Sequence, residues 1–594
     1  MAAWLRGINL CLFFITAALC PLLFSADSPA LRSGWQNIGP GGGGWIEALA
    51  VDPHNPMIVY AGCDVGGVFK SVDGGETWQT ANEGLENDFI RGIVIDPNDS
   101  QVIYAATPGG VHKSLDGAKS WRIKRTGFPP ISAEDFSAPV NTLIISPGNS
   151  NILYAGIGLR ESRGKGRFYK SIDAGESWFL VNAANDMPPQ APENGNIKSP
   201  ARKDISDYGW ITQWGVNINC AARAPSDPRV IYIGTSGHIF KSSDNAASWR
   251  QIYTRQAGPE TFTTRGLETT CIHSLTIDPN DANTIYVGYF DIGLMKSTNG
   301  GMSFQRAVQG MDYDNSTFIV AIDPGNSSVL YAGIGEWSEN KGSFCISRDG
   351  GKSWHVKGKW SGLPRGRVRF ISVDPRSSKE SRRVYAAVDG QGVFKTEDNG
   401  ENWASLNSGF NFQDPRALLL QPANPQALYL AVGRSDKERG GIYASRNQGL
   451  SWERIQTDVE FPNIQVMAFD PADANTLYLG CREYYDPASG DYFPGGLYKS
   501  VDGAKAWVRL LEDKFVSAIA IDANVLYAAC PDHNYHDLSR GRGILKSMDA
   551  GKTWEPFNEN LGSLRVNALA ISPGKSGTLY CGSAGNGLFK REGD

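Results

Sequence analysis

One eight-residue pattern, Ser/Thr-x-Asp-x-Gly-x-x-Trp, recurs along this 594-residue chain and restricts its fold more than any other feature. The first copy is SVDGGETW at Ser71. Later copies begin at Ser114, Ser171, Ser242, Ser347, Thr396, Ser500 and Ser547, with weaker copies at Ser297 and Ser445. A repeat about 50 residues long indicates a structure built from many similar small units rather than one irregular core.

Each copy ends a longer unit with a constant order of segments. An apolar run ends in a turn such as VDPHNP, a second run ends in YAG or a variant, and GVFKS or a variant leads into the box. The second run carries a tyrosine in all eleven units: Tyr60, Tyr104, Tyr154, Tyr232, Tyr286, Tyr331, Tyr385, Tyr429, Tyr478, Tyr527 and Tyr580. Short β-branched and aromatic runs between Gly, Pro, Asn and Asp turns predict four antiparallel strands per unit. We therefore expect an all-β chain that folds as a β-propeller.

The two ends of the chain supply complementary parts of one unit. The last unit, from Arg565 onward, stops before its Trp strand, whereas GWQNIG at residues 34–39 is a Trp strand with no unit before it. We expect the two to form one sheet, so that the N-terminal strand closes a ring. Eleven units fit two packed propellers or one large ring, and the usual size of four to eight blades favours two.

The box resembles the Asp-box repeat of sialidases, sortilins, two-domain xyloglucan hydrolases and photosystem assembly factors. The resemblance implies the propeller fold and says little about function, because in those families the boxes lie away from the ligand. The box also has a physical explanation. Its Ser and Asp can bond the turn, its glycines permit positive φ, and its Trp packs between sheets.

The N-terminus has the composition of an export signal. Arg6 precedes an apolar run from Ile8 to about Phe24, and small polar residues follow. We expect residues 1–26 to be a signal peptide, 27–33 a linker and 34–594 the propeller region. A membrane anchor is the alternative, although the run is short for a spanning helix. The protein would then be secreted or periplasmic.

Composition excludes several kinds of partner. The net charge of −5 is small for this length, so we expect no nucleic acid and, after signal removal, no membrane as a partner. We also expect no cofactor and no metal site.

The long insertions lie on one face of the expected propeller, between second and third strands or between units, opposite the boxes. The longest is a Pro-rich insertion at residues 179–214. Long loops on a rigid scaffold often carry function. Aromatic rings beside carboxylates suit a neutral polyhydroxylated ligand, so we expect a glycan there. The candidate substrate-binding residues are Tyr208, Trp210, Trp214, Glu336, Trp337, Glu483, Tyr484 and Tyr485.

The first unit, NIGPGGGGWIEALAVDPHNPMIVYAGCDVGGVFKS, resembles the start of the two-propeller xyloglucan hydrolases. In that family the Asp before Ile/Val-Gly-Gly is the base of an inverting reaction, and an Asp-Ile-Gly motif in the other propeller supplies the acid. The resemblance implies that Asp64 is the base and that Asp291, in YFDIGLMKS, is the acid. Asp389 occupies the repeat position of Asp64, so an Asp there is also explained by the repeat itself.

Two functions from different classes stay open at this point. The first is an exported carbohydrate-active propeller that binds, and as an inverting glycoside hydrolase cleaves, a β-glucan or xyloglucan-type polysaccharide. The second is a non-catalytic propeller that docks a protein partner on the same face, as sortilins and photosystem assembly factors do. Two carboxylates facing one another would support the enzyme, and an Asp64 bonded into its own turn would support the scaffold.

Overall fold

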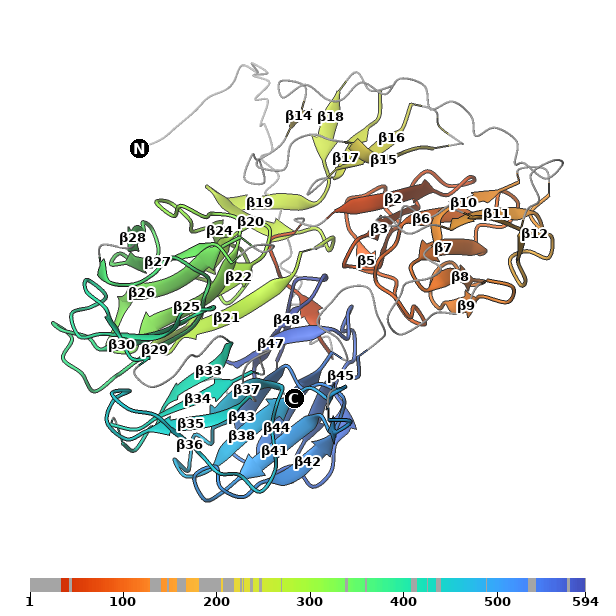
Figure 1. Ribbon diagram of the computed structural model, residues 1–594. Coiled ribbons are helices and arrows are strands. Elements are labelled where there is room, and N and C mark those ends of the chain that lie inside the picture. Colours follow the sequence, from red (N-terminus) through yellow and green to blue (C-terminus); the bar gives the residue numbers. More distant parts are fainter. Residues whose placement is uncertain are drawn as a thin grey trace, which may run out of the picture. The chain divides into compact units, whose positions relative to one another are not determined.

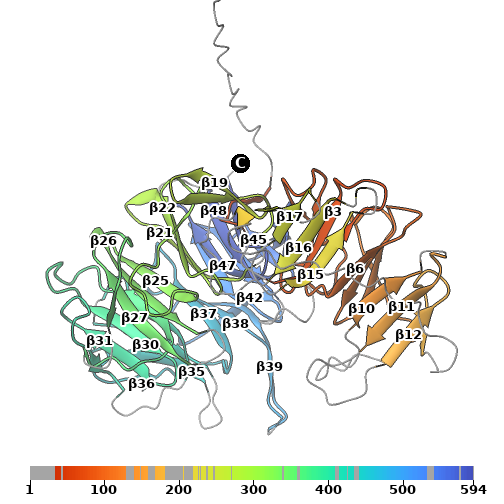
Figure 2. The same ribbon diagram turned by 90° about the horizontal axis from the view of Figure 1, so that it is seen from above.

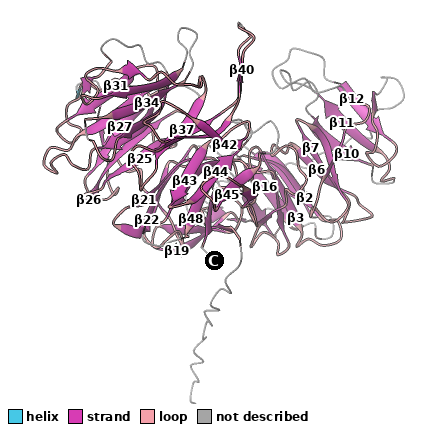
Figure 3. Cartoon of the chain, turned by 90° about the horizontal axis from the view of Figure 1, so that it is seen from below, coloured by secondary structure: helices cyan, strands magenta, loops and turns pink. Residues whose placement is uncertain are grey.

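The computed structural model describes most of the chain from Gly34 onward. The chain divides at Ser33/Gly34 into two units, and residues 1–33 lie outside the described residues. The described residues are 34–41, 45–128, 140–146, 149–157, 167–180, 205–206, 218–224, 227, 229–235, 239–244, 248–268, 270–336, 340–357, 361–407, 414–424, 426–433, 440–487, 489–531, 541–573 and 577–592. Strands and loops make up the ribbon over these residues (Figure 3).

Four successive strands form each sheet, as the repeat predicts. In the first sheet β2 (Ile46–Val51), β3 (Val59–Cys63), β4 (Val68–Ser71) and β5 (Gln79–Thr80) pair antiparallel in chain order. Eleven such sheets occur in the described residues. The other three sheets before residue 252 comprise β6 (Gly92–Ile95), β7 (Ile103–Thr107), β8 (Gly110–Ser114) and β9 (Arg122–Lys124); β10 (Val140–Ile145), β11 (Leu153–Ile157), β12 (Arg167–Ser171) and β13 (Phe179–Leu180); and β15 (Ile218–Arg223), β16 (Ile231–Thr235), β17 (Ile239–Ser242) and β18 (Trp249–Gln251), with β14 (Ile205–Ser206) parallel to β18.

Seven further sheets follow residue 271. They comprise β21 (Ile272–Asp278), β22 (Asp281–Tyr289), β23 (Leu294–Ser297) and β24 (Gln305–Arg306); β25 (Thr317–Asp323), β26 (Asn326–Gly335), β27 (Gly342–Ser347) and β28 (His355–Lys357); β29 (Val368–Val373), β30 (Val384–Val388), β31 (Gly392–Thr396) and β32 (Ala404–Ser405); β33 (Pro415–Leu420), β34 (Leu428–Val432), β35 (Gly441–Ser445) and β36 (Glu453–Arg454); β37 (Ile464–Phe469), β38 (Leu477–Cys481), β41 (Gly496–Ser500) and β42 (Val508–Glu512); β43 (Ala518–Asp522), β44 (Val525–Cys530), β45 (Gly543–Ser547) and β46 (Glu555–Pro556); and β47 (Val566–Ile571), β48 (Leu579–Ser583), β49 (Leu588–Arg591) and β1 (Gln36–Asn37). Two separate hairpins pair β19 (Thr254–Gly258) with β20 (Thr261–Thr264), and β39 (Tyr484–Tyr485) with β40 (Tyr492–Phe493).

The first strands of the sheets contact one another in two series. In the seven later sheets they follow the order β21, β25, β29, β33, β37, β43 and β47, and β47 returns to contact β21 (Figure 1). These sheets are called the seven-sheet ring. The first strands of the earlier sheets run in the order β15, β2, β6 and β10, and these sheets are called the four-sheet group. The units are therefore split between two assemblies, as blade-number limits favour.

The N-terminal strand completes the last sheet of the ring. Gln36 pairs with Lys590, and Asn37 pairs with Phe589. The preceding Trp35 is buried, and its indole N–H donates to the carbonyl oxygen of Phe557 at 2.7 Å. The predicted closure of a ring by the two ends of the chain is confirmed.

In five of the described sheets the unit tyrosine connects its sheet to the box of a neighbouring one, as the hydroxyls of Tyr60, Tyr104, Tyr232, Tyr286 and Tyr580 do. Tyr286 Oη and Lys296 Nζ both donate to the carbonyl oxygen of Gly350, at 2.9 and 2.7 Å. In the same way Tyr580 Oη donates to the carbonyl oxygen of Gly300 at 3.4 Å, which joins the last sheet of the ring to its first. An aliphatic residue could not make these buried polar contacts.

The boxes lie at one end of every sheet, which is called the box end. In the first box, Ser71 Oγ donates to Asp73 Oδ1 and accepts from Gly75 N–H, both at 2.8 Å. The opposite end, where second strands finish and third strands begin, is called the insertion end. Its geometry repeats in six of the described sheets, where the residue after the second strand donates its N–H to the carbonyl oxygen of the residue before the first strand, as Asp389 does to Arg367 at 2.9 Å.

Candidate functional site

Asp64 lies at the insertion end of the four-sheet group. Its backbone N–H donates to the carbonyl oxygen of Trp45 at 3.1 Å, and its Oδ1 accepts from the N–H of Trp45 at 3.0 Å. One oxygen of the carboxylate is thus bonded to the residue that precedes the neighbouring strand β2, which lies outside its own turn. The side chain is half-buried, so it is not sealed from solvent.

Asp291 lies at the insertion end of the seven-sheet ring. It follows β22, and the N–H of Phe290 before it donates to the carbonyl oxygen of Cys271 at 3.1 Å. Thr270 Oγ1 donates to Asp291 Oδ2 at 2.6 Å, which fixes the carboxylate. Asp291 is half-buried as well.

The structure brings these two aspartates together although they belong to different assemblies. Burial raises the pKa of Asp64 well above its usual value, and repulsion from Asp291 and Glu47 raises it further. Burial raises the pKa of Asp291 to about 6, opposed by the hydrogen bond from Thr270. Both carboxylates also act on Cys271, whose pKa is raised to about 12 by burial and by the charges of Asp291 and Asp64. Each of the two carboxyls is therefore protonated more readily than an isolated aspartate.

Polar contacts across the two assemblies fix their spacing beside the aspartate pair. Asn586 Nδ2 donates to the carbonyl oxygen of Gly66 at 2.7 Å, and Asn82 Nδ2 donates to that of Gly562 at 3.1 Å. Gly585 adopts φ 125°, and a Cβ there would lie 1.7 Å from the carbonyl oxygen of Val65. A glycine is therefore needed where the ring approaches the segment that follows Asp64.

Asp389, the repeat equivalent of Asp64, has different surroundings. Its Oδ2 accepts from Arg369 Nε at 2.8 Å and lies 3.5 Å from Arg367 Nε. Asp389 is buried with these two cations, whereas Asp64 faces a second carboxylate. The same repeat position thus supports an ion pair in one sheet and a repulsive pair in another.

The predicted substrate-binding residues are only partly described. Tyr208, Trp210, Trp214 and Trp337 lie outside the described residues. Glu336 follows β26 and is half-buried, at the repeat position that Asp291 holds in the preceding sheet. Glu483, Tyr484 and Tyr485 lie on the insertion between β38 and β41, several sheets away from the aspartate pair around the ring. The structure therefore separates the candidates into two regions of the insertion end.

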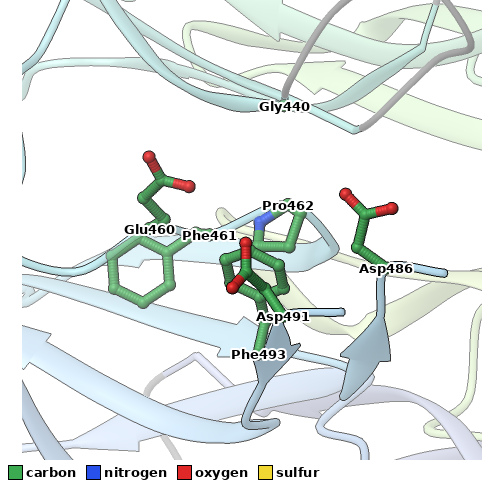
Figure 4. Close-up of a pocket in the computed structure, with 7 residues that line it drawn as sticks. All are labelled: Gly440, Glu460, Phe461, Pro462, Asp486, Asp491 and Phe493. Carbon is green, nitrogen blue, oxygen red and sulfur yellow. The ribbon is translucent and has the colours of Figure 1, made fainter. Parts of the chain in front are cut away.

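A pocket lies beside the β39–β40 hairpin rather than at the aspartate pair. Figure 4 shows Phe461 and Phe493 in its wall, with three carboxylates nearby. Its lining residues are Gly440, Glu460, Phe461, Pro462, Asp486, Asp491 and Phe493.

Sequence reasoning missed the residues that precede the first strands, notably Thr270 and Cys271 beside Asp291. A signal was present, because Cys271 precedes its first strand as Trp45 does in the first unit, and both accept the same backbone hydrogen bond. Aligning the units by strand register would have paired Thr270 and Cys271 with Asp291.

The described residues contain neither a membrane-spanning helix nor a metal-binding cluster. No helix there is long and apolar enough to cross a membrane. No group of three or more His, Cys, Asp or Glu side chains there is arranged to hold a metal ion.

Comparisons with known proteins agree with this fold. The family model described as "Sortilin, neurotensin receptor 3" matches residues 342–488. The crystal structure of an ancestral GH74 enzyme superposes with a TM-score of 0.73 at 17% identity, covering 94% of this chain and 99% of that one. The chain has the β-propeller fold. At this identity the structural likeness extends to the fold alone.

Curated relatives of this Asp-box propeller include two xyloglucanases. The one from Paenibacillus sp is 21% identical over 414 residues, which is 63% of this chain and 37% of that protein. The one from Hypocrea jecorina (strain QM6a) is 24% identical over 259 residues, which is 39% of this chain and 29% of that protein. The chain therefore spans about a third of the length of the curated relatives it matches.

Proposed function

We propose that this propeller is an exported glycoside hydrolase that cleaves a β-glucan or xyloglucan-type polysaccharide with inversion, using Asp64 and Asp291 as its two carboxylates. The observation that carries the proposal is the pairing of two half-buried aspartates from separate assemblies, close enough for one to raise the pKa of the other. Ion pairs with two arginines give Asp389 a structural role. The repulsion between Asp64 and Asp291 does not fit such a role. The xyloglucanase relatives support the choice of substrate.

An inverting reaction needs one carboxylic acid to protonate the leaving oxygen and one carboxylate to activate water. Following the resemblance, we assign the base to Asp64 and the acid to Asp291. A pKa of about 6 keeps Asp291 partly protonated in mildly acidic solution. Burial and the charge of Asp291 also raise the pKa of Asp64 well above its usual value, so the two carboxyls compete for a proton. The assignment therefore requires that this proton lie on Asp291 when substrate is bound.

The test is the release of reducing sugar from soluble xyloglucan and other β-glucans. General acid and base groups each contribute about 10²–10⁴-fold to rate, so Asp64→Asn and Asp291→Asn should each lower kcat by that factor. Glu555→Gln, an exposed carboxylate on the outer strand β46, is the matched control and should leave kcat unchanged. Melting curves establish that the variants fold. No release by the folded wild-type protein would reject the hydrolase and favour the docking of a protein partner.

The proposal includes export after cleavage of residues 1–26, with 27–33 as a linker and the 179–214 insertion on the binding face. N-terminal sequencing of protein recovered outside the cytoplasm tests the first part. A mature chain beginning near Asp27 supports export, and an intact Met1 contradicts it.

A further inference from the structure

The β39–β40 hairpin forms a two-stranded arm at the insertion end of the ring (Figures 2 and 3). Tyr485 pairs with Tyr492, and Tyr484 pairs with Phe493. Since neighbouring residues of a strand point to opposite faces, the two pairs lie on opposite faces of the arm. Tyr485 and Tyr492 are each 60% exposed, whereas Phe493 lines the pocket next to Phe461. The arm thus has an inner packed face and an outer face that carries two tyrosines.

The arm is held at its base and at its tip. The N–H of Glu483 donates to the carbonyl oxygen of Lys514, and that of Asp486 donates to the carbonyl oxygen of Asp491 at 2.9 Å. Tyr492 Oη donates to Glu483 Oε2 at 2.7 Å, so one exposed ring is tied to a carboxylate. Groups fixed before binding lose less entropy when a ligand binds. The exposed pair is therefore preorganised.

Two large aromatic side chains exposed on one face of a short arm indicate a binding surface. Tyrosine offers a flat apolar ring with a polar edge, which matches the apolar face and hydroxyl rim of a pyranose. Glu483 accepts a hydrogen bond from Tyr492, and Asp486 and Asp491 adjoin the two tyrosines in the chain, so an acidic polymer would be repelled. The surroundings favour a neutral sugar chain over a polyuronate.

We propose that Tyr485 and Tyr492 form a second polysaccharide-binding site, on which consecutive sugar units of a neutral β-glucan stack. The arm belongs to the sheet that begins with β37, and the sheets of β43 and β47 separate it from the sheet of Asp291. Both regions lie at the insertion end, so a long polymer can contact both, whereas a short oligosaccharide cannot. The identity of the polymer rests on the proposed function. Two linked sites raise the affinity for the polymer without a new contact at the aspartates.

The test measures binding with hydrolysis removed. In an Asp64→Asn background, retardation in gels containing soluble xyloglucan or polygalacturonate gives the dissociation constant for each polymer. Tyr485→Ala/Tyr492→Ala should weaken xyloglucan binding about tenfold, which corresponds to about 1.4 kcal/mol, because both stacking rings are lost. Tyr485→Phe, which keeps the ring, should retain binding. Leu115→Ala, which removes a 66% exposed apolar side chain next to the box serine Ser114, at the end of the sheets opposite the arm, is the matched control.

Three outcomes would overturn the inference. They are unchanged xyloglucan binding in the double Ala variant, absence of xyloglucan binding by the parent protein, and tighter binding of polygalacturonate than of xyloglucan. Failure of the proposed function looks different. A wild-type protein that releases no sugar, but binds xyloglucan through the two tyrosines, rejects the hydrolase and keeps the arm as a sugar-binding site.

Discussion

Carboxyls at the two ends of the first sheet have pKa values shifted in opposite directions. At the box end, Asp73 accepts from Ser71 Oγ at 2.8 Å and from Thr77 N–H at 2.9 Å. Burial alone raises its pKa, but hydrogen bonds from Thr77 and Ser71 outweigh burial and hold the pKa below its usual value. At the insertion end, burial and Asp291 raise the pKa of Asp64. The repeated hydrogen bonds therefore lower the pKa of the carboxyl at the box end, and a second carboxyl raises that of Asp64 at the insertion end.

The largest expected effect concerns the roles of the paired aspartates. With an aryl glycoside whose leaving group needs no protonation, Asp291→Asn should recover most activity, while Asp64→Asn should stay about 10²–10⁴-fold below the wild type. Added azide should rescue Asp64→Asn by replacing the activated water. Initial rates with both substrates measure these effects. Azide rescue of Asp291→Asn alone would reverse the two roles.

Removing the box tryptophan of the same sheet should affect stability rather than chemistry. Trp78 is buried, and its indole N–H donates to the carbonyl oxygen of Ile252 at 3.2 Å. Trp78→Ala should lower the free energy of unfolding by about 3–5 kcal/mol. Denaturant titration gives this loss, and kcat measured on the folded fraction should stay at the wild-type value. A fall in kcat equal to that of Asp64→Asn would break the contrast between the two ends.

A buried carboxyl near the ring closure should make stability depend on pH. Glu268 is fully buried, and burial raises its pKa to about 8, against hydrogen bonds led by that of Tyr289 Oη at 2.8 Å. A Cβ on Gly39 would lie 1.8 Å from Glu268 Oε1, so the site has no room to rearrange.

Because the folded pKa exceeds the unfolded one, this stabilisation is complete below about pH 4.5 and declines as pH rises through about 8. The decline should be on the order of 2–4 kcal/mol, and Glu268→Gln should remove most of it. Melting temperatures of both proteins across this range measure the difference. Parallel pH curves would show that Glu268 does not control the decline.

The next test compares Asp389 with Asp64, the two aspartates at the same repeat position of the insertion end. Asp389→Asn removes a carboxylate from Arg369 and Arg367, so we expect a loss of about 1–2 kcal/mol in stability. Hydrolysis should change less than threefold, because this carboxylate is paired with cations rather than with a second acid. Urea melts and initial rates on one preparation separate the two effects. A loss of activity as large as that of Asp64→Asn would mean that the repeat position itself is catalytic.

The smallest effect is expected for Asp73→Asn. Two boxes of this chain already carry Asn, and Ser297 Oγ donates to Asn299 Oδ1 at 2.9 Å as Ser71 does to Asp73. The amide oxygen can replace the carboxylate oxygen, so the loss should stay below about 1 kcal/mol. A shift in the urea midpoint corresponding to more than this would show that the charge, and not the hydrogen-bond geometry, matters in the box.

Strand order and ring closure could be predicted because pairing within a unit is local. Tyr60 and Ser71 each recur with neighbours that define their strands, and Trp35 lacks a unit of its own. Which sheets become neighbours was harder to predict, because β2 contacts β15 of the fourth sheet as well as β6 of the second. That choice depends on the fit between distant surfaces, which no short pattern encodes.

The candidate site was predictable only where a residue departs from the repeat. Asp64 and Asp291 were found from their motifs, and their proximity required the three-dimensional arrangement. Tyr484 and Tyr485 looked alike in the sequence, yet the hairpin register turns Tyr484 toward the pairing side of Phe493 and Tyr485 toward solvent. A shift of one residue in strand register moves a side chain to the other face of the hairpin. The flanking sequence did not determine this register.

The most direct test of the central account is the anomeric configuration of the first products. Proton NMR during the first minutes of xyloglucan cleavage distinguishes α from β reducing ends before they equilibrate. The account predicts α-anomers from the β-linked backbone, because water activated by one aspartate attacks opposite the leaving group. Initial β-anomers would contradict an inverting Asp64–Asp291 pair, and the absence of any cleavage would contradict the hydrolase itself.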